Sequence, residues 1–203
     1  MNNYKITVSK PPGEVMIALS LIERFQQKND TNYKINIQFD YTMPLSAGEY
    51  DEDKPNIIFI NPDNCLPDEE NISLGAPEDP SIFGTIMHEF AHLVLLGKRR
   101  DVRTAYLKEF NLQRNWINDY CETDVEEEMA ETFRLYLVNP FLLKLMLPEA
   151  HNFFRKHFKS PTPCSQKHAV AMYEDFGWST KESLREVFGI EHDVYEDILV
   201  VKQ

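Results

Sequence analysis

The sequence predicts an α+β fold with a small N-terminal mixed sheet and a mostly helical C-terminal lobe. Apolar and polar residues alternate strictly over residues 33–41, and a period of two is typical of a half-buried strand. From residue 80 onward, apolar residues recur at the three- and four-residue spacing of amphipathic helices. The length of 203 residues fits one domain. We expect a single domain over 1–203, with an N-terminal lobe over 1–97 and a helical C-terminal lobe over 98–203.

Strands and helices are mixed in the predicted N-terminal lobe. A short alternation ends at Pro11-Pro12-Gly13, and the fully apolar run from Ile57 to Ile60 predicts a central strand. Loops are predicted where polar residues, proline and glycine gather. In order, we expect a strand over 4–8, a helix over 14–28, a strand over 33–41, a loop over 42–55, a strand over 57–60 and a loop over 61–79.

The remainder of the chain is predicted to be helical, and capping signals support two of these helices. Asp79 and Pro80 suit the N-cap and first turn of one helix, which Gly97 ends. Thr123 and Glu126 form a capping box at the start of another. We expect helices over 80–96, 100–117, 124–138, 140–158, 165–176 and 180–188.

Charge and composition argue against several classes of protein. The chain has 33 acidic and 21 basic residues and a net charge of −12, which disfavours nucleic acids and anionic membranes as partners. No apolar stretch approaches the ~20 residues that span a bilayer. Three cysteines without a CxxC spacing indicate free thiols in a reducing compartment. The N-terminus lacks a signal-peptide pattern, which predicts a cytoplasmic protein, with leaderless export or delivery as the alternative. The sequence carries no signal for an oligomeric state.

Residues 88–92 read His-Glu-Phe-Ala-His and contain the HExxH pattern. One helical turn separates His88 from His92, so both imidazoles lie on one face and can bind a single Zn²⁺. Glu89 lies beside them, where it can reach a water activated by the metal without binding the metal itself. Glu89 is also the only charged side chain between Pro80 and Gly97, which predicts a buried helix. The alternative is a pair of core histidines with ordinary hydrogen bonds.

A catalytic zinc usually takes three protein ligands, and the segment after residue 123 is the best source of the third. Glu126 and Glu128 suit a solvated acidic first turn, which the helix dipole favours. Glu127 and Glu131 lie one turn apart beside a small alanine, so one can bind the metal while the other accepts a hydrogen bond from a histidine. Spacing favours Glu127 and leaves Glu128 and Glu131 as alternatives. No pattern links the helix to the other histidines, which are His151, His157, His168 and His192.

Together with HExxH, the residues from Glu127 to Arg134 resemble the zinc protease domain of anthrax lethal factor and its relatives. These are Glu-type zincins, whose second motif reads Glu-x-x-Ala-Glu-x-Phe-Arg. The resemblance extends roughly over 82–158. It implies that Glu127 is the zinc ligand, that Glu131 supports a liganding histidine, and that Tyr120 stabilises an oxyanion. Two positions differ from the family pattern: Ala91 replaces a common glycine, and Glu128 replaces an apolar residue.

The resemblance implies a zincin-like domain that is a zinc-dependent endopeptidase, with Zn²⁺ on His88, His92 and Glu127. Glu89 would then be the general base and Tyr120 the oxyanion donor, and the C-terminal lobe would carry the third ligand. A protein or peptide is the expected substrate, whereas nucleic acid and membrane are not expected partners. Two alternatives stay open: a zincin-like scaffold that binds a partner without cleaving it, and an acidic protein that mimics DNA or sequesters a basic partner.

Overall fold

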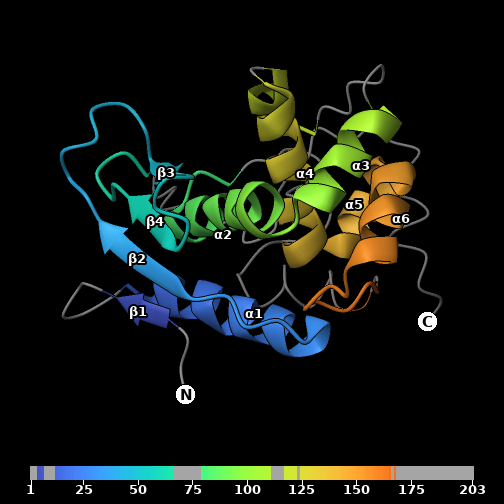
Figure 1. Cartoon of the computed structure of the whole chain (residues 1–203), viewed down its shortest axis with the longest axis horizontal. Coiled ribbons are helices and arrows are strands. Elements are labelled where there is room, and N and C mark those ends of the chain that lie inside the picture. Colours follow the sequence, from blue (N-terminus) through green and yellow to red (C-terminus); the bar gives the residue numbers. More distant parts are fainter. Residues whose placement is uncertain are drawn as a thin grey trace.

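A four-stranded mixed sheet and a group of helices make up the part of the chain that this computed structural model describes, which is residues 4–6, 12–65, 79–110, 117–122, 124–165 and 167. The α+β prediction is therefore confirmed (Figure 1). The elements in order are β1 (Tyr4–Ile6), α1 (Gly13–Asn29), β2 (Ile35–Phe39), β3 (Gly48–Tyr50), β4 (Ile57–Ile60), α2 (Ile82–His92), the π-helix η1 (Leu93–Lys98), α3 (Arg100–Phe110), the 3₁₀ helix η2 (Asp119–Glu122), α4 (Val125–Val138), α5 (Pro140–Met146) and α6 (Pro148–His157).

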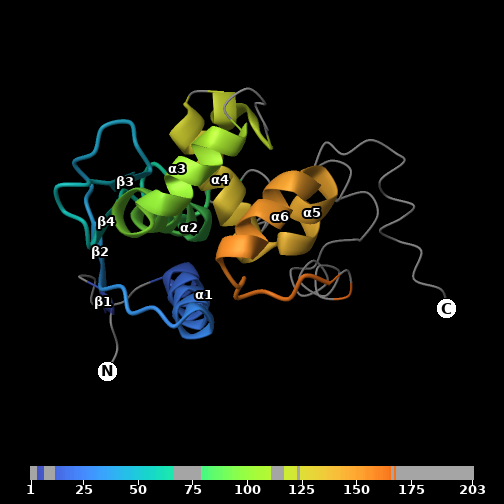
Figure 2. The same ribbon diagram turned by 45° about the vertical axis from the view of Figure 1, so that its right-hand side comes forward.

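The sheet has the strand order β1-β2-β4-β3. β1 and β4 both pair with β2 in parallel, whereas β3 pairs antiparallel with β4. Burial alternates along the two central strands, which puts the buried Ile35, Ile37, Ile58 and Ile60 on one face. The described helices lie on that side of the sheet (Figure 2). The run from Ile57 to Ile60 is thus a central strand, as its apolar composition predicts.

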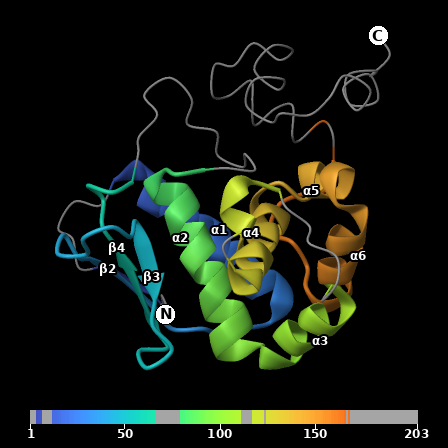
Figure 3. The same cartoon turned by 90° about the horizontal axis from the view of Figure 1, so that it is seen from above.

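Helix α2 occupies the middle of the molecule, between the sheet and α4 (Figure 3). The ring of Phe25 in α1 meets the ring of Phe90 in α2 at 5.6 Å and that of Phe133 in α4 at 6.1 Å, both edge to face. These three aromatic residues join three helices into one apolar core. Because α2 is surrounded in this way, a polar group on it needs a partner from a neighbouring element.

Several predicted boundaries differ from the structure, and each difference has a local cause. The predicted loop over 42–55 contains β3, a strand too short to show a period. The predicted helix over 140–158 is two helices, because Pro148 cannot donate a backbone hydrogen bond and disfavours helical geometry at Leu147. The predicted helix over 100–117 is confirmed over Arg100–Phe110, and its positions 111–116 lie outside the described residues.

The predicted N-caps are also wrong by one or two residues. Ser81, not Asp79, caps α2 by accepting a hydrogen bond from the backbone of Gly84. Asp79 instead accepts hydrogen bonds from the backbone and hydroxyl of Ser81. Asp124, not Thr123, caps α4. The predicted helices over 165–176 and 180–188 lie outside the described residues, apart from positions 165 and 167.

Within the described part of the chain, no helix combines the length and apolar character that a membrane crossing needs.

Candidate metal site

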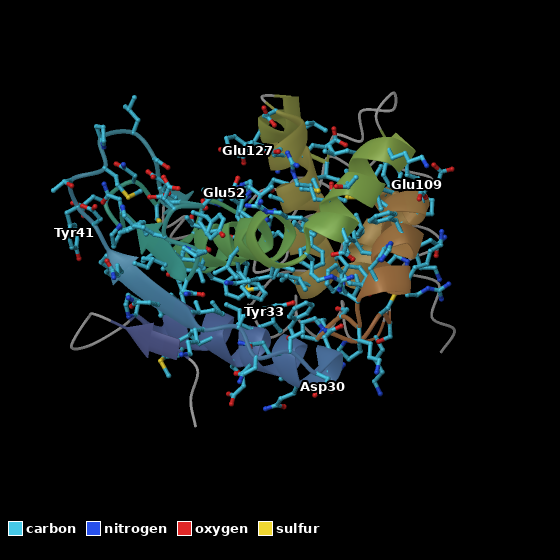
Figure 4. The ribbon with its side chains drawn as sticks, viewed as in Figure 1. Asp30, Tyr33, Tyr41, Glu52, Glu109 and Glu127 are labelled. Atoms are coloured by element: carbon cyan, nitrogen blue, oxygen red, sulfur yellow. The ribbon has the colours of Figure 1, made fainter. Side chains whose placement is uncertain are left out.

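Two histidines of α2 and one glutamate of α4 bring three potential ligand atoms to one point. The Nε2 atoms of His88 and His92 are 2.9 Å apart. Oε2 of Glu127 lies 2.9 Å from the first and 3.1 Å from the second. Glu127 projects from α4 above α2 (Figure 4). Among the described residues, this is the one cluster of His, Cys, Asp or Glu side chains whose atoms converge closely enough to hold a metal ion.

The local structure of α2 explains why the two imidazoles face the same way. Positions four apart in an α-helix share a face, and α2 is regular from Ile82 to His92. Both histidines are buried, with exposed fractions of 8% and 7%. The expectation of a buried helix is confirmed, since every residue from Phe83 to His92 is buried.

The orientation of α4 separates the three glutamates that the sequence left as alternatives. Glu127 faces the two Nε2 atoms, and Glu131, one turn later, contacts Nδ1 of His88 at 2.6 Å. Glu128 points elsewhere, and its carboxylate accepts a hydrogen bond from the hydroxyl of Tyr106 at 3.4 Å. Consecutive residues in a helix are rotated by about 100°. Glu127 and Glu128 therefore cannot both face the histidines.

Glu131 holds the ring of His88 in place and is itself held by other donors. Arg134 donates to both carboxylate oxygens of Glu131, from Nε at 3.1 Å and from Nη2 at 2.8 Å. Asn118 donates to Oε2 from its amide nitrogen at 2.6 Å. A histidine whose Nδ1–H is bound to a carboxylate presents a fixed, more basic Nε2, which is the usual arrangement around a metal-binding imidazole.

The protonation states of His88, Glu127 and Glu131 depend on one another. Burial by itself lowers the pKa of His88, but its hydrogen bonds with Glu127 and Glu131 outweigh that effect and raise the pKa to about 10. Burial by itself raises the pKa of both glutamates, yet both pKa values end below the usual range. The histidines cause this at Glu127, and Arg134 and His88 cause it at Glu131. Without a cation, the site therefore holds a proton on His88 between two carboxylates, and a metal must displace it.

Glu89 is buried beside this group, with an exposed fraction of 6%. Strand β3 lies directly against it: a methyl group at Gly48 would be 2.8 Å from Oε1 of Glu89. The backbone of Tyr50, two residues later, forms a hydrogen bond with the carboxylate. Burial raises the pKa of Glu89, and the neighbouring His88 and His92 oppose that rise. A carboxylate with a raised pKa suits a group that must accept and then return a proton near neutral pH.

A cavity of about 330 Å³ opens beside His88 and is lined by Gly48, His88, Glu89, Tyr120 and Glu131, among others. Tyr120 is half exposed, and its ring lies 5.7 Å from the ring of His88. Burial, the charges of Glu127 and Glu89, and a hydrogen bond with the Glu127 carboxylate all raise the pKa of Tyr120. Its hydroxyl therefore stays a hydrogen-bond donor throughout the neutral range.

The donor set fits a divalent cation. Two imidazole nitrogens and one carboxylate oxygen are typical ligands of Zn²⁺ in catalytic sites. Tetrahedral zinc with bonds of about 2.0–2.1 Å separates its ligand atoms by roughly 3.3 Å. The 2.9–3.1 Å separations seen here lie within a few tenths of an ångström of that value. His88, His92 and Glu127 are thus a possible metal site.

The structure also brings together residues that the sequence analysis did not single out. Asn118 and Arg134 bind Glu131, and Gly48 approaches Glu89. Arg134 ends the second motif, which is the one signal that could have identified it. His151 lies away from the site, where its Nε2 is 3.6 Å from Sγ of Cys164. His168 and His192 lie outside the described residues.

No protein-family model, no curated protein and no solved structure matches this chain. The structure supports the coarser part of the resemblance, which is a buried His–His–Glu group with HExxH spacing.

Proposed function

We propose that this protein is a zinc-dependent endopeptidase of the Glu-type zincin class. The observation that carries the proposal is the buried carboxylate of Glu89 next to the His–His–Glu group, in the wall of a cavity. A metal site that serves only structure needs no ionisable group beside it and is closed by protein ligands. The motif resemblance to the lethal factor family supports the same assignment.

Each residue then has one task in peptide hydrolysis. His88, His92 and Glu127 would hold the Zn²⁺, which would supply a Lewis acid for the scissile carbonyl and for water. Glu89 accepts the proton of the attacking water and delivers it to the leaving amine as the C–N bond breaks. Tyr120 donates a hydrogen bond to the oxyanion that forms on the carbonyl oxygen, an effect worth roughly 2.7–4 kcal/mol for such donors.

An extended peptide is the proposed substrate. Among the described strands, β3 lies at one edge of the four-stranded sheet, and residues 45–48, which lead into it, line the cavity. Edge strands bind extended peptides through backbone hydrogen bonds, as an additional strand. The net charge of −12 gives no support to nucleic acid or an anionic membrane as a partner.

Two measurements test the proposal. Elemental analysis of protein purified without chelators or metal-affinity resin should find about one zinc per chain. Peptide-library cleavage should be lost in Glu89→Gln, because the glutamine amide cannot accept the proton of the water. Zinc should be retained, because residue 89 is not a metal ligand in the wild type or in the variant. Loss of about 10²-fold or more is expected for a general base.

Contrary results point to the alternatives. Zinc binding without cleavage of any library peptide would indicate a non-catalytic scaffold. Absence of zinc, with no uptake after addition, would leave His88 and His92 as core residues and favour an acidic partner-binding protein.

A further inference from the structure

Tyr120 lies on a short element that needs an external support. It belongs to the 3₁₀ helix η2, which has four residues. Helices this short have poor hydrogen-bond geometry and do not hold a side chain rigidly on their own. Tyr120 is half exposed; its ring lies 5.7 Å from that of His88 and its side chain forms a hydrogen bond with the Glu127 carboxylate, so the backbone turn that carries it is the part that still has to be fixed. A catalytic hydrogen-bond donor nevertheless has to be held within a fraction of an ångström.

The side chain of Asn118 supports η2 through hydrogen bonds with Cys121. Its Oδ1 accepts hydrogen bonds from the backbone N–H of Cys121 at 3.1 Å and from Sγ of the same residue at 3.1 Å. Cys121 is fully buried, so it anchors η2 in the core. Asn118, two residues before Tyr120, and Cys121, directly after it, are thus joined by the asparagine side chain, which adds to the backbone hydrogen bond from the N–H of Cys121 to the carbonyl of Asn118 at 3.3 Å.

The same side chain reaches the metal site. Its Nδ2 donates to Oε2 of Glu131 at 2.6 Å, and the other oxygen of Glu131 contacts Nδ1 of His88 at 2.6 Å. An asparagine carries one acceptor and one donor group, and here each is used toward a different part of the site. The amide of Asn118 thus links the Tyr120 turn to His88 through Glu131, in addition to the hydrogen bond between the Tyr120 side chain and the Glu127 carboxylate.

We propose that Asn118 is a positioning residue that fixes the Tyr120 turn and Glu131 relative to each other. This rests on the proposed function, because the task of Tyr120 is defined there. Asn118 lines the cavity but is not one of the three candidate metal ligands, and both ends of its amide are used on Cys121 and Glu131. It acts by setting the position of the oxyanion donor and by holding the carboxylate that orients His88.

The test compares Asn118→Ala, which removes both interactions, with Asn118→Asp. The aspartate keeps the acceptor for Cys121 but replaces the donor with an oxygen that faces the Glu131 carboxylate. Zinc affinity is measured by competition with a chelator. The kcat for peptide cleavage is measured at saturating zinc. Exchange of the Cys121 amide hydrogen is followed by mass spectrometry. Circular dichroism confirms that each variant is folded.

Both variants should weaken zinc binding by about tenfold or more, as is usual when a group behind a ligand is lost. Asn118→Ala should also lower kcat at saturating zinc by about 10²-fold, with less effect on KM, because the donor is misplaced. Cys121 exchange should speed up in Asn118→Ala and stay slow in Asn118→Asp. In a Tyr120→Phe background, Asn118→Ala should change kcat at saturating zinc by less than about threefold, because the effect through Glu131 falls on zinc affinity and the effect on kcat acts through the Tyr120 hydroxyl.

Asn29→Ala is the matched control. Asn29 likewise uses both ends of its amide, donating to the carbonyl of Lys159 at 2.8 Å and accepting from its N–H at 2.7 Å, far from the cavity. Zinc affinity and kcat should be unchanged in this variant.

Zinc affinity and Cys121 exchange equal to wild type in Asn118→Ala would overturn the proposal. A full loss of kcat repeated in the Tyr120→Phe background would do the same. If wild type binds zinc but cleaves nothing, the proposed function fails, and zinc affinity and amide exchange still decide the role of Asn118. If Asn118→Ala does not fold, zinc affinity in Asn118→Asp decides it.

Discussion

Replacing Gly48 with alanine would put a methyl group between β3 and α2, the helix that carries His88 and His92. The added Cβ would lie 2.6 Å from Cγ2 of Thr85 and 2.8 Å from both Cγ and Oε1 of Glu89. Carbon atoms in contact prefer separations of about 3.5–4.0 Å, so these distances cannot persist. Thr85 cannot move away easily, because it is β-branched, 8% exposed and part of α2. The strand, or the side chain of Glu89, has to shift.

The cost of that shift can be worked from the contacts. Adding a methyl group to a close-packed interior typically destabilises a protein by about 1–3 kcal/mol. For a domain of this size, each kcal/mol lowers Tm by about 2–4 °C, which gives a fall of about 2–12 °C. If the strain is relieved by displacing Glu89 by about 1 Å, turnover should fall by about 10²-fold.

Thermal unfolding followed by circular dichroism measures the first effect, and peptide cleavage the second. Gly13→Ala is the matched control, because a Cβ at Gly13 meets nothing within 4 Å and Gly13 begins α1. That variant should be neutral, or more stable by about 0.4–1 kcal/mol through a less flexible unfolded chain. A Gly48→Ala protein as stable as Gly13→Ala would refute the close approach of β3 to α2.

Two further predictions concern the metal. Glu127→Ala should abolish zinc binding in a chelator-competition titration, whereas Glu128→Ala should keep it, because Glu128 faces Tyr106 and not the histidines. Loss of zinc in Glu128→Ala alone would show that Glu128 is the ligand and that the assignment of Glu127 is wrong. Zinc binding at pH 7 should release about one proton per chain, because the pKa of His88 in the metal-free protein is raised to about 10 and the metal needs its Nε2 unprotonated. The release should diminish as the pH rises through that pKa, and titration calorimetry in buffers of different ionisation enthalpy measures it. Heats that do not depend on the buffer would contradict this expectation.

Much of the fold could be predicted from local patterns. The alternation over residues 33–41 identified β2, and the apolar run from Ile57 to Ile60 identified a central strand, because a period of two is a property of the backbone. The break at Leu147 was also readable, since Pro148 stands in the sequence, and the predicted single helix there overlooked it. β3 could not be predicted, because three residues carry no period and the strand exists through its pairing with β4.

The chain by itself determined that His88 and His92 share a face with Glu89 beside them, because the helical period fixes the directions of residues four apart. It also determined that this helix would be buried, since Glu89 is its only charge. Only the tertiary structure decided between Glu127, Glu128 and Glu131, because the choice depends on the rotation of α4 about its axis against α2. The roles of Gly48, Asn118 and Arg134 were likewise decided there. Each acts through contacts with residues of other elements, and no local pattern encodes the distance between elements that are far apart in sequence.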